Sequence, residues 1–373
     1  MHIDAQFDSG NIECISSHDP QNIRLNIRRD AHSDFFQWFH FRVSGATGIP
    51  CRFVIENAHS SAYAKGWHGY QARYSTNRKD WKLAQTSYDE QHLTIELTPE
   101  QDIVYLAYFA PFSLEYHQDL IVSMVSKGAS YEFLGHSLDG RSIDLLRFGN
   151  PQAKRKCWLI ARQHPGESMA EWWMKGFLER LSDPSDPISK ALLSKAELYI
   201  VPNMNPDGSF RGHLRTNAAG ANLNREWENP SLERSPEVYW VREKMRSTGV
   251  DFCLDVHGDE EIPYNFIAGA EGIPSYTERQ AQLKESYCEI LKRCSPDFQT
   301  EFGYPVSPPG TANMTMCTSH VAEYFDCLAM TLEQPFKDVA SAPDSETGWS
   351  PTRAMCFGAA NVSALFEICE ALR

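Results

Sequence analysis

The stretch His164-Pro165-Gly166-Glu167 decides how this sequence is interpreted. It follows an apolar run at residues 157–161 and precedes a helical pattern at residues 168–181. An apolar run, a polar junction and a helical pattern in that order predict a strand followed by a helix. An imidazole and a carboxylate three residues apart at such a junction are part of a catalytic zinc site. The stretch therefore predicts α/β structure with metal ligands at a strand end.

Strands and helices alternate from about residue 126 onwards. Such alternation predicts an α/β domain over residues 126–373, with a mixed, largely parallel sheet flanked by helices. Ser235-Pro236 and Ser350-Pro351 each read as an N-cap followed by proline in the first helical turn. The predicted strands are 156–164, 197–204, 252–257, 265–270 and 327–333, and the predicted helices are 168–181, 236–247, 275–293 and 351–372.

The first 125 residues have a different pattern, of short apolar or alternating runs separated by turn residues. This pattern predicts an N-terminal antiparallel β-sandwich domain over residues 1–125. Its many aromatic side chains are expected to form the core and the packing between domains. The predicted strands are 23–27, 35–43, 52–57, 93–97 and 103–109.

Composition narrows the classes of function. The net charge of −14 argues against nucleic acid or an anionic membrane as a partner. No apolar run approaches the ~20 residues of a membrane span, and the N-terminus does not resemble a secretory signal. The ten cysteines are scattered without close pairs, which predicts reduced thiols and a cytoplasmic location.

Further polar segments follow or end the other predicted strands. Functional residues of parallel sheets gather beyond the carboxyl ends of the strands. These segments are Asn205-Pro206-Asp207-Gly208, the Asn- and Arg-rich residues 215–227, Asp255-Val256-His257-Gly258-Asp259, and Glu333.

These segments supply the parts of a metal-dependent hydrolase. Two histidines and a glutamate leave a coordination position on zinc open for water. A carboxylate that does not bind the metal must take the proton of that water, and a positive group must face the developing oxyanion. We predict His164, Glu167 and His257 as ligands of one zinc ion, Glu333 as general base and Arg215 as the oxyanion group. Each of these residues alone has an ordinary structural explanation, and the case depends on all of them occurring together.

The same motifs resemble the zinc metallocarboxypeptidases, and within them the cytosolic carboxypeptidase-like branch, which also has an N-terminal β-sandwich. The resemblance covers about residues 156–336. It implies that His164, Glu167 and His257 bind zinc and that Glu333 acts as base and then as acid. It also implies that Arg215 stabilises the oxyanion and that Asn224 and Arg225 hold the C-terminal carboxylate of the substrate.

The sequence departs from that family at two places. The mobile active-site tyrosine is not in a motif that can be aligned, which leaves Tyr304, Tyr324 and Tyr264 as candidates. Eukaryotic members that remove glutamate have Gly-Thr-Gly-Arg before the catalytic glutamate, where this chain has Gly310-Thr311-Ala312-Asn313. Asn313 therefore argues against an acidic C-terminal residue, unless His320 or Lys337 compensates.

The sequence as a whole predicts a zinc-dependent exopeptidase that removes C-terminal residues from peptide or protein tails. The alternative enzyme is an aspartoacylase- or succinylglutamate desuccinylase-like amidohydrolase, which cleaves small N-acyl amino acids with a similar zinc motif. A non-catalytic zinc- or peptide-binding protein, and a main function in the N-terminal domain, are rivals of another class. The preferred C-terminal residue, the natural substrate and the oligomeric state stay open.

Overall fold

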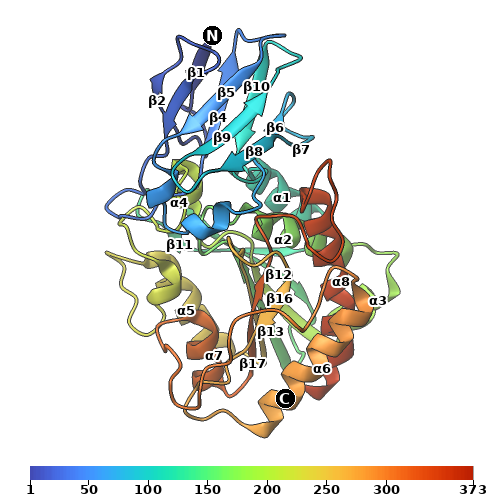
Figure 1. Cartoon of the computed structure of the whole chain (residues 1–373). Coiled ribbons are helices and arrows are strands. Elements are labelled where there is room, and N and C mark those ends of the chain that lie inside the picture. Colours follow the sequence, from blue (N-terminus) through green and yellow to red (C-terminus); the bar gives the residue numbers. More distant parts are fainter. Residues whose placement is uncertain (373) are drawn as a thin grey trace.

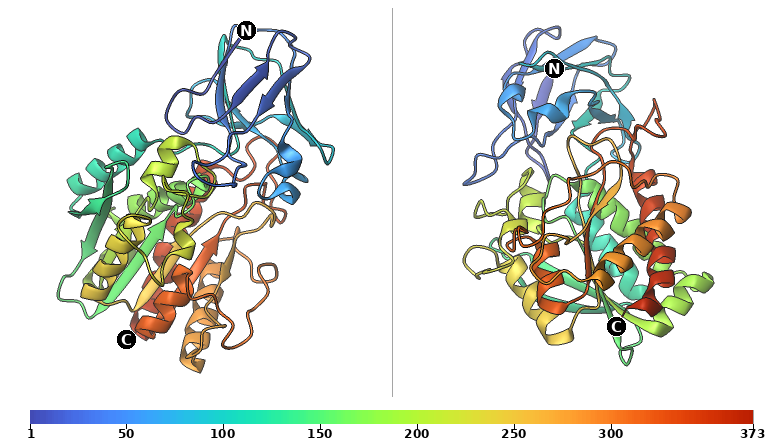
Figure 2. Two further views of the ribbon diagram at one scale, coloured as in Figure 1. Left: turned by 90° about the vertical axis from the view of Figure 1, so that its left-hand side faces the viewer. Right: turned by 60° about the horizontal axis from the view of Figure 1, so that its bottom comes forward.

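The computed structural model describes residues 1–372 and has two parts (Figure 1). Two five-stranded sheets form the N-terminal part, and a seven-stranded sheet with helices on both faces forms the remainder. Figure 2 shows that the N-terminal sheets sit at one end of the larger part. The predicted combination of a β-sandwich and an α/β domain is confirmed.

The N-terminal strands make two sheets, in the orders β1-β4-β10-β6-β7 and β2-β3-β5-β9-β8. All their pairings are antiparallel except the parallel pair β3–β5. The strands are β1 (His2–Asp4), β2 (Glu13–Ser16), β3 (Ile23–Asn26), β4 (His40–Ser44), β5 (Cys51–Ile55), β6 (Arg73–Ser75), β7 (Lys82–Leu83), β8 (Gln85–Tyr88), β9 (Leu93–Leu97) and β10 (Ile103–Ala107).

The aromatic side chains of this part are mainly core, as expected. Trp38, Phe39 and Phe41 on and beside β4 are at most 1% exposed. Tyr108 stacks on Phe336 of the other part with ring centroids 4.4 Å apart. The aromatic core therefore extends across the junction between the two parts of the molecule.

The large sheet has the order β11-β12-β14-β13-β15-β17-β16. Its four central strands are parallel, and the outer pairings are antiparallel, so the predicted mixed and largely parallel sheet is confirmed. The strands are β11 (Ser130–His136), β12 (Ser142–Gly149), β13 (Arg155–Ala161), β14 (Ala196–Val201), β15 (Phe252–Val256), β16 (Phe266–Ala268) and β17 (Leu328–Glu333).

Helices cover both faces of this sheet, so alternate strand residues enter two different cores. Leu159 of β13 packs in the core that contains Trp173 and Phe177 of α2, whereas its neighbour Ile160 packs in the core that contains Val241 of α5. The helices are α1 (Leu114–Ser126), α2 (Ser168–Leu181), α3 (Pro187–Lys195), α4 (Pro206–Arg211), α5 (Pro236–Thr248), α6 (Glu278–Cys294), α7 (Cys317–Phe325) and α8 (Pro351–Ile368).

Helix α8 is long and apolar. The segment Pro351–Ala371 is long and apolar enough to cross a membrane, but half of its most apolar window is buried inside the protein. It packs against α2 and α6, with Phe357 and Leu365 at most 1% exposed. Its apolar character is accounted for by this packing.

The predicted strands and helices of the α/β part all exist, with ends that differ by a few residues. Ser350 caps α8 through the N–H of Arg353, as predicted, but Ser235 makes no side-chain cap to α5. The Ser235 hydroxyl lies instead 3.3 Å from a Glu226 carboxylate oxygen. The sequence did not reveal the β11–β12 hairpin or helices α1, α3, α4 and α7. The division of the chain at residue 125 stays a prediction.

Candidate active site

The carboxyl ends of the central parallel strands carry the predicted site. His164 and Glu167 lie in the loop between β13 and α2, and His257 directly follows β15. Glu333 is the last residue of β17. Because the strands are parallel neighbours in the sheet, these four side chains meet at one edge.

His164, Glu167 and His257 form the one cluster in residues 1–372 that could hold a metal ion, with ligand atoms within 4.8 Å of one another. One Glu167 oxygen is 2.6 Å from His164 Nδ1, and the other is 2.8 Å from His257 Nδ1. The two Nδ1 atoms are 3.2 Å apart. Three buried donors that converge in this way are suited to a cation.

The other nitrogen of each imidazole faces an oxygen acceptor. His257 Nε2 lies 2.8 Å from Asp255 Oδ2, and His164 Nε2 lies 3.0 Å from Asn222 Oδ1. A proton on each Nε2 leaves the Nδ1 lone pair free to bind a metal. Gln163 in turn donates to Asp255 Oδ2 at 2.6 Å. Asn222 therefore holds the His164 ring through a hydrogen bond, and Asp255 faces the His257 ring as a close acidic neighbour.

The electrostatics of His164 and Glu167 agree with this donor set, whereas those of His257 do not. Burial would lower the pKa of His257, but Asp255 and Glu167 outweigh it and raise that pKa well above its ordinary value, so a metal ion would have to displace a proton from this ring. Burial, with a further effect of Arg215, lowers the pKa of His164 to about 4, so its imidazole is neutral at pH 7. Burial alone would raise the pKa of Glu167, but His164 and His257 outweigh it and hold that pKa below its ordinary value. A neutral imidazole and an ionised carboxylate are the forms that bind zinc.

Glu333 is 6% exposed and lies beside Tyr304 and Asp259. The Tyr304 hydroxyl donates to Asp259 Oδ2 at 2.6 Å and lies 3.3 Å from Glu333 Oε1. Burial raises the pKa of Glu333 well above its ordinary value, with His257 opposing and Glu167 adding to the rise. A carboxyl group beside a bound water molecule is the kind of group that can take a proton from it and return it later.

Of the three candidate tyrosines, only Tyr304 is among the residues that line the cavity. It lies on the loop between α6 and α7 and is 47% exposed. Tyr264 stacks on Phe302, and Tyr324 stacks on His320. The structure therefore places Tyr304, and neither of the others, beside Glu333.

Arg215 lies between two aromatic rings of the N-terminal part. Its guanidinium carbon is 5.6 Å from the centre of the Phe35 ring and 5.5 Å from that of Tyr63. Tyr63 itself lines the cavity. The N-terminal part thus contributes directly to the wall of the site, which nothing in the sequence around Tyr63 signalled.

Asn224 and Arg225 lie in the short helical turn Leu223–Arg225. Asn224 Oδ1 accepts the N–H of Cys317 at 2.9 Å, so the amide NH2 group is the part of this side chain that can donate to a ligand. Arg225 donates to the carbonyl of Asn224 at 2.6 Å. Burial and the neighbouring Arg215 lower the pKa of Arg225. A bound anion, such as a carboxylate, would therefore stabilise the charged form of this guanidinium.

The other asparagines of this segment are structural. Asn217 Oδ1 accepts the N–H groups of Ala219 and Ala221, both at 3.0 Å. Asn222 accepts the N–H of Asn224 at 3.1 Å and faces His164. The unusual asparagine content therefore holds the loop in shape, and Asn224 is its member in the cavity wall.

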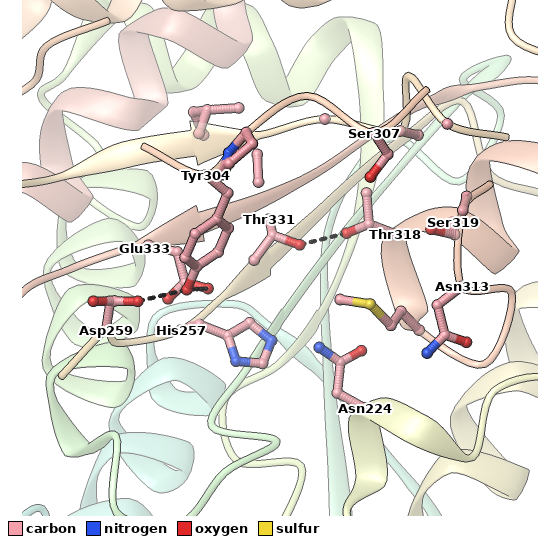
Figure 3. Close-up of a pocket in the computed structure, with 18 of the residues that line it drawn as sticks. Asn224, His257, Asp259, Tyr304, Ser307, Asn313, Thr318, Ser319, Thr331 and Glu333 are labelled. Carbon is pink, nitrogen blue, oxygen red and sulfur yellow. Dashed lines mark hydrogen bonds between the residues drawn. The ribbon is translucent and has the colours of Figure 1, made fainter. Parts of the chain in front are cut away.

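The side chains described above line one cavity of about 720 Å³ (Figure 3). All the residues predicted from the sequence line it: His164, Glu167, Arg215, Asn224, Arg225, His257 and Glu333. Residues that the prediction did not include also line it, among them Tyr63, Asp259, Glu260, Glu271, Thr318 and Thr331. Asp259 belongs to a motif that was already notable in the sequence, but the others have no local sequence signal.

Asn313 lines the cavity as well, whereas His320 and Lys337 are not among its lining residues. Asn313 Oδ1 accepts the N–H and the hydroxyl of Thr315 at 3.0 and 2.6 Å. Lys337 donates to the carbonyl of Glu261 at 3.2 Å. Neither His320 nor Lys337 therefore places a positive charge in the cavity in place of an arginine at position 313.

Comparison with known proteins gives the family. Residues 3–109 match the model of the cytosolic carboxypeptidase N-terminal domain, and residues 114–287 match the zinc carboxypeptidase model. The chain belongs to the zinc carboxypeptidase family. It is a zinc metallocarboxypeptidase, a peptide hydrolase whose family implies one zinc ion, and the comparisons give no support to the alternative amidohydrolase.

Similar proteins cover the whole chain. An uncharacterized protein of Zymomonas mobilis is 51% identical over 100% of this chain and 97% of its own length. The structure of a metallo-carboxypeptidase from Pseudomonas aeruginosa, in complex with (2-guanidinoethylmercapto)succinic acid, is 48% identical with a TM-score of 0.98 over 100% of both chains. A metallo-carboxypeptidase from Burkholderia cenocepacia is 44% identical with a TM-score of 0.97 over 99% of both.

Eukaryotic relatives are more distant. The cytosolic carboxypeptidase 6 of Caenorhabditis elegans is 26% identical over 92% of this chain and 81% of its own length. The bovine cytosolic carboxypeptidase 3 is 26% identical over 85% of this chain, which spans 35% of that protein. This metallocarboxypeptidase therefore corresponds to a part of the longer eukaryotic proteins.

Proposed function

We propose that this metallocarboxypeptidase removes the C-terminal residue from peptide or protein tails in the cavity at the carboxyl edge of its large sheet. The observation that carries the proposal is the convergence of metal donors, a buried carboxyl group and two arginines in one cavity. The role of each residue follows from its position there.

His164 and His257, each through Nδ1, and Glu167 through its carboxylate would hold the zinc ion. When bound, zinc supplies a Lewis acid that polarises a carbonyl group and lowers the pKa of a water molecule toward ~7. Asp255 and Asn222 keep the two imidazoles in the required tautomer.

Arg225 and the amide NH2 group of Asn224 would bind the C-terminal carboxylate of the substrate. A guanidinium offers that carboxylate a planar two-point contact. The relative from P. aeruginosa binds (2-guanidinoethylmercapto)succinic acid, whose succinate also carries carboxylates. Anchoring a free C-terminus places only the last peptide bond near Glu333, which makes the enzyme an exopeptidase.

Glu333 would take a proton from the attacking water onto its carboxylate and pass it to the nitrogen of the leaving residue. Its position at the end of β17, beside His257 in the cavity, suits this exchange. The Arg215 guanidinium, held between Phe35 and Tyr63, would face the oxygen on which negative charge develops. Tyr304, which Asp259 holds next to Glu333, is our candidate for the mobile tyrosine.

We further propose that the enzyme works in the cytoplasm, without nucleic acid or membrane as a partner. The net charge of −14 disfavours both surfaces. All ten cysteines are free thiols, as expected in a reducing compartment. The eukaryotic relatives are named cytosolic carboxypeptidases.

The test is the Glu333→Gln variant, assayed on peptides whose shortening is followed by mass spectrometry. We expect the variant to keep its zinc and to lose turnover by at least about 100-fold, because general base catalysis contributes 10²–10⁴-fold. Glu301→Gln, at an exposed position, is the matched control. Chelation should stop hydrolysis by the wild type, and zinc should restore it. Retention of most activity by Glu333→Gln would show that another group is the base.

A further inference from the structure

We propose that the end of the cavity next to Asn224 selects a neutral, hydrogen-bonding C-terminal side chain, with glutamine as its best representative. The hydroxyl pair Thr318–Thr331 is the specificity-determining feature. This inference rests on the proposed function, because the side chain concerned is that of the residue that the enzyme removes.

The position of the side-chain pocket follows from the strand that carries Glu333. Thr331 lies two residues earlier on β17, so it points to the same face and is displaced by about 7 Å along the strand. Asn224, which would hold the substrate carboxylate, is bonded to the N–H of Cys317, the neighbour of Thr318. A residue held between Asn224 and Glu333 therefore directs its side chain toward Thr318 and Thr331.

Figure 3 shows the same division of the cavity. His257, Glu333, Tyr304 and Asp259 lie on one side of the view, and the hydroxyl and amide side chains lie on the other. The latter are Asn224, Ser307, Asn313, Thr318, Ser319 and Thr331. The proposed catalytic residues and the polar, uncharged pocket thus occupy separate regions of one cavity.

The cavity wall contains a neutralised pair of charges. Glu271 and Lys284, which both line the cavity, form an ion pair with each other, and Arg215 and Arg225 are the cations assigned above to the oxyanion and to the terminal carboxylate. A glutamate side chain would find Lys284 already paired, and an arginine side chain would find Glu271 already paired. Burying a charge without a partner is costly, so both classes of charged residue are disfavoured.

The hydroxyl pair supplies what a neutral polar side chain needs. Thr318 and Thr331 are 5% and 6% exposed, and their hydroxyl oxygens are 2.7 Å apart. Each hydroxyl has one donor and two acceptor positions, so the bonded pair keeps one O–H and several lone pairs for a ligand. An amide, which both donates and accepts, satisfies these groups, whereas an apolar side chain of the same size leaves them unpaired.

The experiment compares four peptides that differ only in the last residue, which is Gln, Glu, Met or Arg. Met and Glu match the length of Gln without its amide, and Arg tests the cationic class. We expect the wild-type kcat/KM for Gln to exceed those for the other three by at least about 10-fold, the discrimination of a site built around a polar group.

Two variants then test the hydroxyl pair. Thr318→Val keeps the shape and removes the hydroxyl, so the ratio of kcat/KM for Gln to that for Met should fall by about 10-fold or more. Thr248→Val, at the distant end of α5, is the control and should leave the ratio unchanged. Thr318→Asp places an unpaired carboxylate in the pocket and should raise the kcat/KM for Arg.

The outcomes separate this inference from the proposed function. If all four peptides are shortened with similar kcat/KM, or if Glu, Met or Arg is preferred, the inference is wrong while the exopeptidase function stands. If the zinc-loaded enzyme shortens none of them, both fail. An unchanged Gln-to-Met ratio in Thr318→Val would also overturn the role of the hydroxyl pair.

Discussion

The carboxylate of Asp30 accepts the backbone N–H of Arg215 at 2.8 Å, across 185 residues of sequence. The same carboxylate accepts the N–H groups of Leu214 and Thr216 at 2.7 and 2.9 Å, and it is 2% exposed. Asp30 belongs to the β-rich N-terminal part. One buried carboxylate of that part therefore fixes the backbone of the loop that carries the proposed oxyanion group.

We predict that Asp30→Asn lowers kcat/KM by about 10- to 100-fold, because hydrogen bonds to a charged group are worth about 1.5–3 kcal/mol. The amide would also turn a donor toward the N–H groups of the loop. Steady-state kinetics check this, with Asp34→Asn as the control, since that side chain is 95% exposed. In an Arg215→Ala background, Asp30→Asn should cause no further loss of kcat/KM. An equal loss in both backgrounds would mean that Asp30 does not act through Arg215.

Zinc affinity should depend on Asp255, although this residue is not a metal ligand. Its Oδ2 atom lies 2.8 Å from His257 Nε2. Removing such a partner typically weakens metal binding by about 10- to 100-fold. We therefore expect Asp255→Asn to lose zinc to a competing chelator at a correspondingly lower chelator concentration. Asp251→Asn, before the other end of β15, is the control, and equal zinc affinities of all three proteins would refute the prediction.

Much of the site was predictable because parallel strands place their carboxyl ends at one edge. His164, His257 and Glu333 each follow or end a strand with an unmistakable apolar run, so their proximity follows from the sheet order. Asn224 and Arg225 do not lie at a strand end, and the resemblance to a known family was needed to assign them. The family motif identified these two residues, whereas the spacing of apolar residues along the chain could not.

Other features were not predictable from local sequence. Asp30 and Tyr63 join the site because two separate folds pack together, and packing between distant segments has no periodic signal. The β11–β12 hairpin was missed although β12 has an apolar run, Ile143, Leu145 and Leu146, that is fully buried. Tyr131 and Phe133 of the edge strand β11 are exposed at 44% and 45%. Thr318 and Thr331 are ordinary residues of a helix and a strand until the fold brings them together.

The packing of α2 against α8 gives a stability prediction. A Cβ atom on Gly358 would lie 2.0 Å from the carbonyl oxygen of Trp173, and one on Gly176 would lie 2.0 Å from that of Met355. Alanine has the higher helix propensity by about 1 kcal/mol, so without this contact Gly358→Ala would be stabilising. We expect it instead to destabilise the protein by about 1–3 kcal/mol, the usual cost of overpacking.

Thermal or urea unfolding of Gly358→Ala measures this effect. Ser363→Ala, at a partly exposed position of the same helix, is the control and should change stability by less than about 0.5 kcal/mol. A Gly358→Ala variant as stable as the wild type would mean that the two helices can move apart without cost.

Glu237 should make the stability of the protein depend on pH. It is buried at the start of α5, where burial raises its pKa from 4.5 to about 8, although Asn217 donates to its carboxyl oxygens at 3.2 and 3.4 Å. Below pH 4.5 the Glu237 carboxyl group is protonated in both the folded and the unfolded chain. Between pH 4.5 and about 8 only the unfolded chain releases it, so the free energy of unfolding falls by up to about 1.4 kcal/mol per pH unit.

Glu237→Gln removes this titration while keeping the shape and the hydrogen bond from Asn217. The variant should therefore gain stability relative to the wild type as pH rises from 5 to 8, and its advantage should stop growing above about pH 8. Urea unfolding at several pH values measures the difference, with the exposed Glu233→Gln as the control. A difference between Glu237→Gln and the wild type that stays constant over this range would show that Glu237 is ionised in the folded protein.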